Sequence, residues 1–366
     1  MSTLETNSIG KYSGNNVSFD DALNLKSYST SARNALTSVA GDLIYNSDDN
    51  KVQVYNGSSW DDLGGIAAFQ LQYVIVGGGG SGPTAYGSAN IAGGGGGAGG
   101  YISSVIGENS GGGLSSHQIM YVAPSTNYPV SIGAGGAGYT SGTRQDAGLM
   151  GTGTYFNNIT AEGGGGGQSY GEPSHTGKGG MGGSGGGRGS YINRSWGSTV
   201  GPDGITGQGY KGGNSQQVYN GAANAAGGGG GASAAGGNGS SNNGGDGGAG
   251  VATSISGSSV TYAGGGGGGA YSTQGTGGAG GGADGVKNAN GNAGTANTGG
   301  GAGGIYITNA TQRYGGNGGS GIVILRYPNT FTISQTGLTF ETGGEQTTGT
   351  DKYVVITAGT GTVSWS

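Results

Sequence analysis

The chain has 366 residues, 99 of them glycine, and its 13 basic and 18 acidic side chains give a net charge of −5. An average protein contains about 7% glycine, so the composition indicates an unusual structural class, and the lack of cysteine excludes a disulfide framework and a thiolate metal site. The acidic balance argues against a nucleic-acid-binding protein, because phosphate contacts need clustered basic side chains and those of this chain are scattered.

The opening residues MSTLETNSIGKYSG lack a basic end followed by an apolar stretch, so we expect no signal peptide. The longest apolar runs lie at residues 73–76 and 322–325. Both are far shorter than the roughly 20 apolar residues of a membrane-spanning helix, so we expect no membrane insertion.

Residues 1–66 have the composition of an ordinary soluble protein. The stretch DLIYNSDDNKVQVYNGSSWDDLG (42–64) predicts a β-hairpin, with a first strand at 43–45 and alternating apolar residues after the turn. A short helix or turn is expected at 31–36. This region is too small to bury a core alone, so we expect it to pack against neighbours, and trimerisation is the simplest source of them.

Residues 67–328 repeat a loose pattern in which a short apolar segment is followed by a run of glycine. Most of the apolar segments are β-branched or aromatic, as strands require, and their irregular spacing excludes a solenoid of fixed period. We expect the first and last of them to lie close together in one sheet that closes the domain. The segments are QYVIV (72–76), YPVSIG (128–133), TYFNNITAEGG (154–164), SISGSSVTYAGG (254–265), GIYITN (304–309) and GIVILRY (321–327).

Three explanations of the glycine runs fit the sequence poorly. A flexible linker does not account for the Tyr, Ile, Val and Trp residues that recur between the runs. Collagen needs glycine at every third position and abundant proline, whereas this chain has runs such as GGGGG and only 6 prolines. A calcium-binding β-roll needs the GGxGxD repeat, which the sequences around Asp246 and Asp284 do not match, although they leave an isolated cation open.

The fourth explanation is a bundle of packed polyproline-II helices made of glycine. Such a helix has three residues per turn and no internal hydrogen bonds, so its buried N–H and C=O groups must find partners outside it. Helices without side chains can approach closely enough to bond one another directly, and Cα–H···O contacts add to this. We favour this structure for the glycine-rich domain.

Residues 329–366 return to alternating apolar and polar sequence. The stretches FTISQTGLTF (331–340) and KYVVITAGTGTVSW (352–365) predict three or four short strands. The expected fold is therefore all-β and irregular, with short strands framing a glycine-rich domain (67–328) and small β modules at both ends (1–66 and 329–366).

No sequence motif predicts an enzyme. Matches to GxGxxG are expected by chance in a chain this rich in glycine, and Gly177-Lys178-Gly179 lacks the Ser or Thr of a phosphate-binding loop. His117 and His175 each stand alone in loop-like sequence, and the acidic residues are too dispersed to form a catalytic pair. We therefore expect no catalysis, no cofactor and no metal site.

Binding residues are expected where the glycine content falls. The segments 115–128, 171–182, 188–204 and 208–221 combine aromatic and polar residues, as glycan- or protein-binding loops do. The alternative is that these aromatic side chains only cover the edges of the glycine core. The candidate receptor-binding residues are Arg188, Tyr191, Asn193, Arg194, Trp196, His175, Tyr210 and Tyr219.

Several segments resemble the glycine-rich tail-fibre or adhesin proteins of tailed bacteriophages, especially those that infect cyanobacteria. Residues 24–64 resemble a module often found at the start of phage fibre proteins, and GLTF (337–340) with ITAGTGTVSWS (356–366) resembles a C-terminal module of cyanophage structural proteins. Glycine-rich segments resemble the central domain of such proteins. These are YVIVGGGG, GGGGGAGGY, YPVSIGAGGAG, SVTYAGGGGGG and SGIVILRYP.

The resemblance implies a virion structural protein in which a glycine bundle displays variable loops to a host receptor. The end modules depart from those of the adhesins, which leaves open a place at the tail tip, along a fibre or on the capsid. We expect residues 1–66 to bind other virion proteins, the chain to form a homotrimer on a virion appendage, and the loops to bind a host surface glycan or outer-membrane protein.

Other functions fit the same composition. A capsid decoration or head-fibre protein has a purely structural role, and an extracellular-matrix glycine-rich protein is a further option. An ice-binding protein needs a flat face with regularly spaced threonines, whereas the threonines of this chain are scattered.

Overall fold

A computed structural model describes residues 25–63, 68–86, 90–141, 146–169, 180–191, 200–216, 224–309 and 311–366. The chain divides into two compact units, residues 1–67 and residues 68–366. Across these described ranges, no helix is long and apolar enough to cross a membrane.

The first unit contains a small four-stranded sheet in the order β1-β2-β3-β4 and one short helix. The predicted hairpin is confirmed, because β2 and β3 pair in antiparallel register with Leu43 opposite Val54. The side chain of Ser29 accepts a hydrogen bond from the Ala32 N–H and so caps the helix. The elements are β1 (Ser27–Tyr28), α1 (Thr30–Asn34), β2 (Leu43–Asn46), β3 (Lys51–Tyr55) and β4 (Trp60–Asp62).

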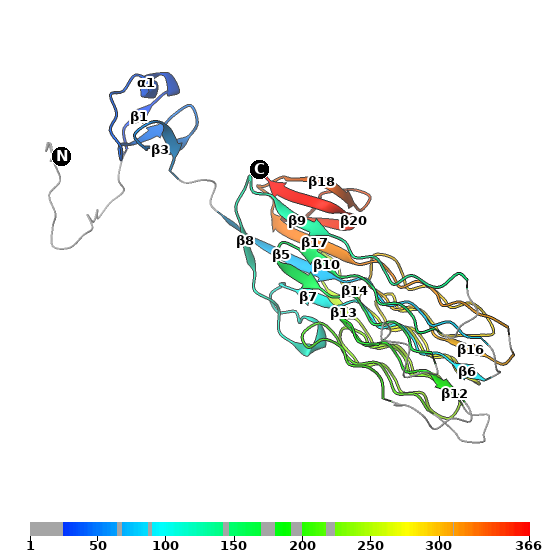
Figure 1. The fold of residues 1–366 in the computed structure, drawn as a ribbon. Helices are drawn as coiled ribbons and strands as arrows, with labels where there is room; N and C mark the ends of the chain where they lie inside the picture. Colours follow the sequence, from blue (N-terminus) through cyan, green and yellow to red (C-terminus); the bar gives the residue numbers. More distant parts are fainter. Residues whose placement is uncertain are drawn as a thin grey trace. The chain divides into compact units, whose positions relative to one another are not determined.

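The second unit is organised around a ten-stranded sheet, whose main path runs β11-β10-β9-β20-β17-β5-β7 (Figure 1). The predicted pairing of the first and last apolar segments is confirmed, because β5 and β17 are antiparallel neighbours with Val76 opposite Ile322. The strands are β5 (Phe69–Val76), β7 (Tyr101–Ser103), β8 (Met120–Val122), β9 (Tyr128–Ser131), β10 (Thr154–Phe156), β11 (Ile159–Ala161), β17 (Ile322–Pro328), β18 (Ile333–Phe340), β19 (Gln346–Thr348) and β20 (Asp351–Trp365).

The C-terminal strands belong to this same sheet. Strand β20 pairs with β17 and β9 along one edge, at its first and last residues respectively, and with β19 and β18 along the other. Residues 329–366 therefore share their backbone hydrogen bonds with β17, which closes the glycine-rich sequence, and with β9.

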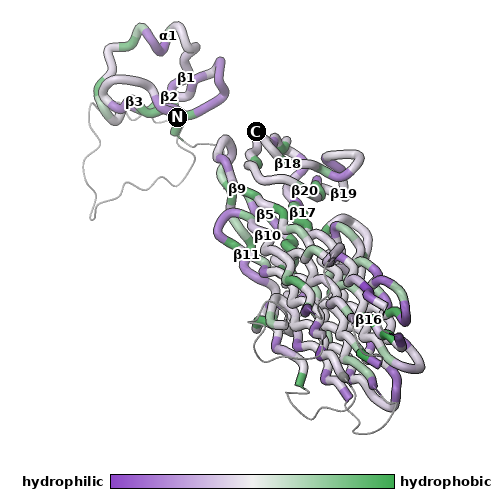
Figure 2. The backbone as a smooth tube through the Cα atoms, turned by 45° about the vertical axis from the view of Figure 1, so that its right-hand side comes forward, coloured by the Kyte–Doolittle hydropathy of each residue, from purple (hydrophilic) through white to green (hydrophobic). Residues whose placement is uncertain are grey.

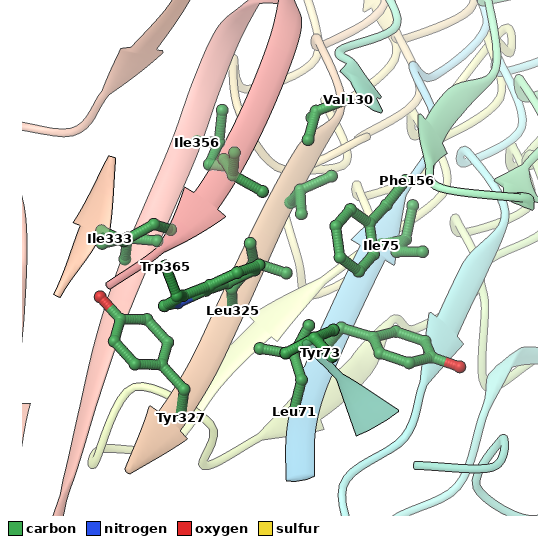
Figure 3. Packing of buried hydrophobic residues seen from close by; sticks show 14 of the residues in the cluster. Leu71, Tyr73, Ile75, Val130, Phe156, Leu325, Tyr327, Ile333, Ile356 and Trp365 are labelled. Carbon is green, nitrogen blue, oxygen red and sulfur yellow. The ribbon is translucent and has the colours of Figure 1, made fainter. Parts of the chain in front are cut away.

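The main hydrophobic core lies on one face of this sheet (Figure 3). Alternate residues of β5, such as Tyr73, point into it, and Trp365 from β20 is buried there against Tyr327 with ring centroids 5.7 Å apart. Tyr73 also meets Phe156 of β10 at 6.0 Å, because β17 and β9 pair with the same edge of β20 and so bring their neighbours β5 and β10 together. The other face of β5 packs Val74 into a second buried cluster.

The glycine runs extend away from the large sheet as long segments that lie side by side and appear pale on the hydropathy scale of Figure 2. Successive backbone N–H groups of a run donate in turn to three different neighbouring segments. Along residues 77–82, N–H groups three residues apart donate to the same neighbouring segment, at carbonyl groups three residues apart in the opposite direction. All three neighbouring segments therefore run antiparallel to residues 77–82. The bonds join Gly77 and Gly80 to Gly100 and Gly97, Gly78 and Ser81 to Thr152 and Leu149, and Gly79 and Gly82 to Gly319 and Gly316.

The same pattern occurs in the run at 264–269. Its donors reach residues 280 and 283, then 248 and 245, then 96 and 93. The run is buried throughout, so these bonds satisfy backbone groups that have no access to water. A repeat of three residues is the period of a polyproline-II helix.

Close approach of the backbones requires glycine in these runs. A Cβ added to Gly266 would lie closer than 3.0 Å to the carbonyl oxygen of Ala302, and one added to Gly95 would come equally close to the carbonyl oxygen of Gly266. The α-hydrogens therefore face carbonyl oxygens of the adjacent segments, which is the arrangement of weak Cα–H···O contacts.

A second, four-stranded sheet in the order β12-β6-β16-β15 lies at the end of this unit away from β9, β18 and β20 (Figure 1). We call it the distal sheet. The remaining elements of the unit are a two-stranded sheet and one short 3-10 helix. The bounds are β6 (Ile91–Ala92), η1 (Gly111–Gly113), β12 (Ser190–Tyr191), β13 (Val251–Thr253), β14 (Val260–Tyr262), β15 (Val286–Lys287) and β16 (Ile305–Ile307).

Candidate functional site

Three segments, 170–179, 192–199 and 217–223, contain most of the predicted receptor-binding residues and lie outside the described residues. Residues next to two of them are hydrogen-bonded to one another at the distal sheet. Ser190 Oγ donates to the carbonyl oxygen of Gln216 at 2.5 Å and lies 3.3 Å from Asn224 Oδ1. The residues on both sides of 217–223 therefore meet the strand that precedes 192–199.

His175, Asn193, Arg194, Trp196 and Tyr219 lie outside the described residues.

Three of the candidate receptor-binding residues, Arg188, Tyr191 and Tyr210, lie in the described part of the chain, and Tyr210 lies apart from the other two. The backbone of Tyr191 pairs with Ile91 in the distal sheet. Arg188, three residues earlier, is partly buried and donates a hydrogen bond to Gln168 Oε1, and burial lowers the pKa of its guanidinium. Tyr210 lies elsewhere, because a Cβ on Gly113 in η1 would be 2.7 Å from its hydroxyl oxygen.

An aromatic and cationic cluster at the distal sheet was missed in the sequence. Lys287 Nζ lies 4.6 Å from the ring centroid of Tyr271 and 5.9 Å from that of Tyr306, and it donates to the carbonyl oxygen of Tyr271 at 2.6 Å. The two rings meet edge to face with centroids 6.0 Å apart. Cation–π and edge-to-face contacts of this kind hold the side chains in place.

The cluster has a buried side and an exposed side. Tyr306 is fully buried, and burial raises the pKa of its hydroxyl to about 12, so that it stays a neutral donor to Asn90 Oδ1 at 2.8 Å. Tyr271 is 38% exposed, and Lys287 is exposed as well. The outer side chains are therefore available to a ligand while the inner ones fix their position.

Asn224 links this cluster to the strand that carries Tyr191. It is buried and donates from Nδ2 to the carbonyl oxygen of Asn90 at 2.7 Å, and its own carbonyl oxygen accepts from the Tyr271 N–H at 3.2 Å. We refer to Asn90, Asn224, Tyr271, Lys287 and Tyr306 as the distal cluster. The one sequence feature that could have indicated the distal cluster is Tyr271, an aromatic residue that follows closely after the glycine run at 264–269.

The chemistry of the distal cluster suits binding. It offers an exposed ring and an ammonium group that has further donors besides the one used on Tyr271. Lys287 takes part in none of the three ion pairs among the described residues, which are Lys51–Asp62, Arg326–Asp351 and Lys352–Glu345.

The described residues contain no group of three His, Asp or Glu side chains that could hold a metal ion. The two aspartates considered for an isolated cation bond to the chain itself. Asp246 accepts from the N–H and hydroxyl of Thr276 at 2.7 and 2.9 Å, and Asp284 accepts from the Gly277 N–H at 2.7 Å.

A cavity of about 460 Å³ lies beside the large sheet and is lined by Tyr73, His117, Met120 and Ile159 among others. His117 Nδ1 lies 2.5 Å from the Tyr73 hydroxyl oxygen. That hydroxyl is also 2.9 Å from the carbonyl oxygen of Gln118, and burial raises the Tyr73 pKa to about 12. The phenol therefore remains neutral, and the contact anchors residues 117–118 to β5.

The fold and the distal cluster define an all-β protein whose body is a glycine bundle. Residues 64–328 match the family model described as a glycine-rich domain. The chain belongs to this glycine-rich domain family. No curated protein matches the chain.

Proposed function

We propose that the protein is a virion structural protein of a tailed bacteriophage, a tail-fibre or adhesin subunit that binds the host cell surface through its distal end. The single observation that carries this proposal is the position of the distal cluster. It lies at the end of the glycine bundle away from the large sheet, beside Tyr191 and the residues that flank 217–223.

The body suits this role because it is compact and chemically inert. We propose that its runs are polyproline-II helices, supported by the period of three residues in their hydrogen bonds. Bonds to three neighbours at once resist bending of any one run. Such a body holds one end of the unit at a fixed distance from the large sheet.

The distal cluster supplies the contacts that surface recognition needs. An exposed aromatic ring provides area at a small entropy cost, and polar groups beside it give direction. Tyr271 and Lys287 form such a pair. The buried Tyr306 ring packs against Tyr271, and the Asn224 carbonyl oxygen accepts a hydrogen bond from the Tyr271 N–H. The proposed ligand is a host surface glycan or an outer-membrane protein.

Adsorption of the purified full chain to host cells tests this proposal. We expect Tyr271→Ala with Lys287→Gln to weaken adsorption about tenfold or more, as loss of a binding hot spot does. Ile106→Ala is the control, because Ile106 is 71% exposed and lies outside both the distal cluster and the candidate binding segments. Equal adsorption of the double variant, the control and the unchanged protein would remove the distal cluster from the binding site.

A further inference from the structure

The first unit buries almost no apolar side chain of its own. Among residues 25–63 the buried side chains are Ile44, Asn46 and Gln53, of which only Ile44 is apolar. Small domains are marginal even with a complete core, because they bury too little surface to offset the entropy of ordering the chain. A unit with one buried apolar residue needs apolar contacts from outside itself.

A polar network fills the place of a core. Asn46 Nδ2 donates to Thr30 Oγ1 at 3.1 Å and to Gln53 Oε1 at 3.1 Å, while Gln53 Nε2 donates to Asp62 Oδ1 at 2.8 Å. Arg33 donates to the same Gln53 oxygen at 2.7 Å. Such bonds define the geometry of the unit, but each replaces a bond to water and adds little net stability.

The apolar side chains of the unit lie on its surface instead. Val39 is 67% exposed and Leu43 is 41% exposed. Beside them is a recess of about 240 Å³ lined by Leu36, Leu43, Ile44, Tyr28 and Trp60, with Lys26 and Asp42 among its polar lining residues. One face of the unit therefore combines an apolar recess with projecting apolar side chains.

We propose that this face, formed by Leu36, Val39, Leu43 and Trp60, is the interface through which copies of this chain associate. A copy of the same unit fits it because each copy supplies both an apolar recess and an exposed apolar side chain to fill one. The polar residues that line the recess include one basic side chain, Lys26, and one acidic side chain, Asp42. Opposite charges can therefore meet when two copies associate. Association then buries the apolar surface that the isolated unit leaves in water.

The proposal does not depend on the proposed function, and the assembly of the full chain tests it. We expect light scattering or native mass spectrometry to give the mass of two or more 34.9 kDa chains. Val39→Asp with Leu43→Asp is expected to lower that mass to one chain at the same concentration. The control Ile106→Asp, at an apolar residue 71% exposed in the second unit, should leave the assembly unchanged.

Cross-linking provides a second readout that does not rely on disrupting the interface. The chain has no cysteine, so Val39→Cys introduces a single thiol on the proposed face and Ile106→Cys introduces one outside it. Under mild oxidation we expect disulfide-linked dimers from Val39→Cys and at least tenfold fewer from Ile106→Cys. A monomeric full chain, an unchanged mass for the double aspartate variant, or equal cross-linking of the two cysteine variants would each overturn the proposal, because another segment or another protein would then cover this face.

Discussion

Replacing Gly266 by valine probes whether the glycine runs are packed or merely flexible. Gly266 is buried, its N–H donates to the carbonyl oxygen of Gly96 at 2.9 Å, and its own carbonyl oxygen accepts from the Gly229 N–H at 2.8 Å. A Cβ at this position would lie closer than 3.0 Å to the carbonyl oxygen of Ala302, which is a backbone atom and cannot rotate away. The substitution must therefore push whole segments apart.

The cost follows from the two hydrogen bonds. Leaving a buried backbone group without a partner costs about 1–3 kcal/mol, and overpacking adds about 1–3 kcal/mol. We expect Gly266→Val to lower the free energy of unfolding by at least about 3 kcal/mol, a large share of the ~5–15 kcal/mol that stabilises a typical domain. A glycine in a flexible segment predicts the opposite sign, because a bulkier residue there reduces the entropy of the unfolded chain.

Urea denaturation followed by circular dichroism and fluorescence measures this difference. Gly349→Asn is the control, because Gly349 has a φ of +61° and no atom lies within 4 Å of an added Cβ. Asparagine tolerates that backbone conformation, so we expect a change within about 0.5 kcal/mol, as at an ordinary surface site. An unchanged urea midpoint for Gly266→Val would refute the packed arrangement.

Three further predictions concern other parts of the chain. Amide hydrogen exchange should be slow along the glycine run at 264–269, since its N–H groups bond to neighbouring segments, and exchange at the rate of an unfolded peptide would contradict this. Burial disfavours the charged form of Glu345, but hydrogen bonds from Lys352, the Tyr327 hydroxyl and the Ile333 N–H outweigh it and lower its pKa. A lowered folded-state pKa means that this contribution is present above the unfolded value and is lost as the pH falls through the folded value, so thermal stability should drop below about pH 4, and Glu345→Gln should remove this part of the pH dependence. Tyr191→Ala with Trp196→Ala should reduce host adsorption without changing the melting temperature, and unchanged adsorption would exclude these two residues from the site.

Features carried by side-chain patterns could be predicted from the sequence. The hairpin of β2 and β3 follows from alternating apolar residues on either side of a polar turn. The pairing of β5 with β17 follows from the two strongest apolar segments, which are buried on both faces and therefore read as continuous apolar runs.

The arrangement of the glycine runs could not be predicted in the same way. Glycine has no side chain, so a run such as 93–100 contains no pattern that selects its partners, and the register depends on backbone bonds and on the strands at its ends. The distal cluster was missed for a related reason. Tyr271, Lys287 and Tyr306 are separated by low-complexity sequence, and only the packing of three different runs brings them together.

The location of the distal cluster in an intact particle tests the central claim most directly. Gold labelling of a single cysteine introduced by Tyr271→Cys in the full chain, viewed by electron microscopy of the assembled particle, reports whether this end faces outward. Our account predicts label at the outermost end of a tail appendage. Label on the capsid shell, or no accessible thiol because the distal cluster is buried against the particle, would contradict a host-binding role for this end of the protein.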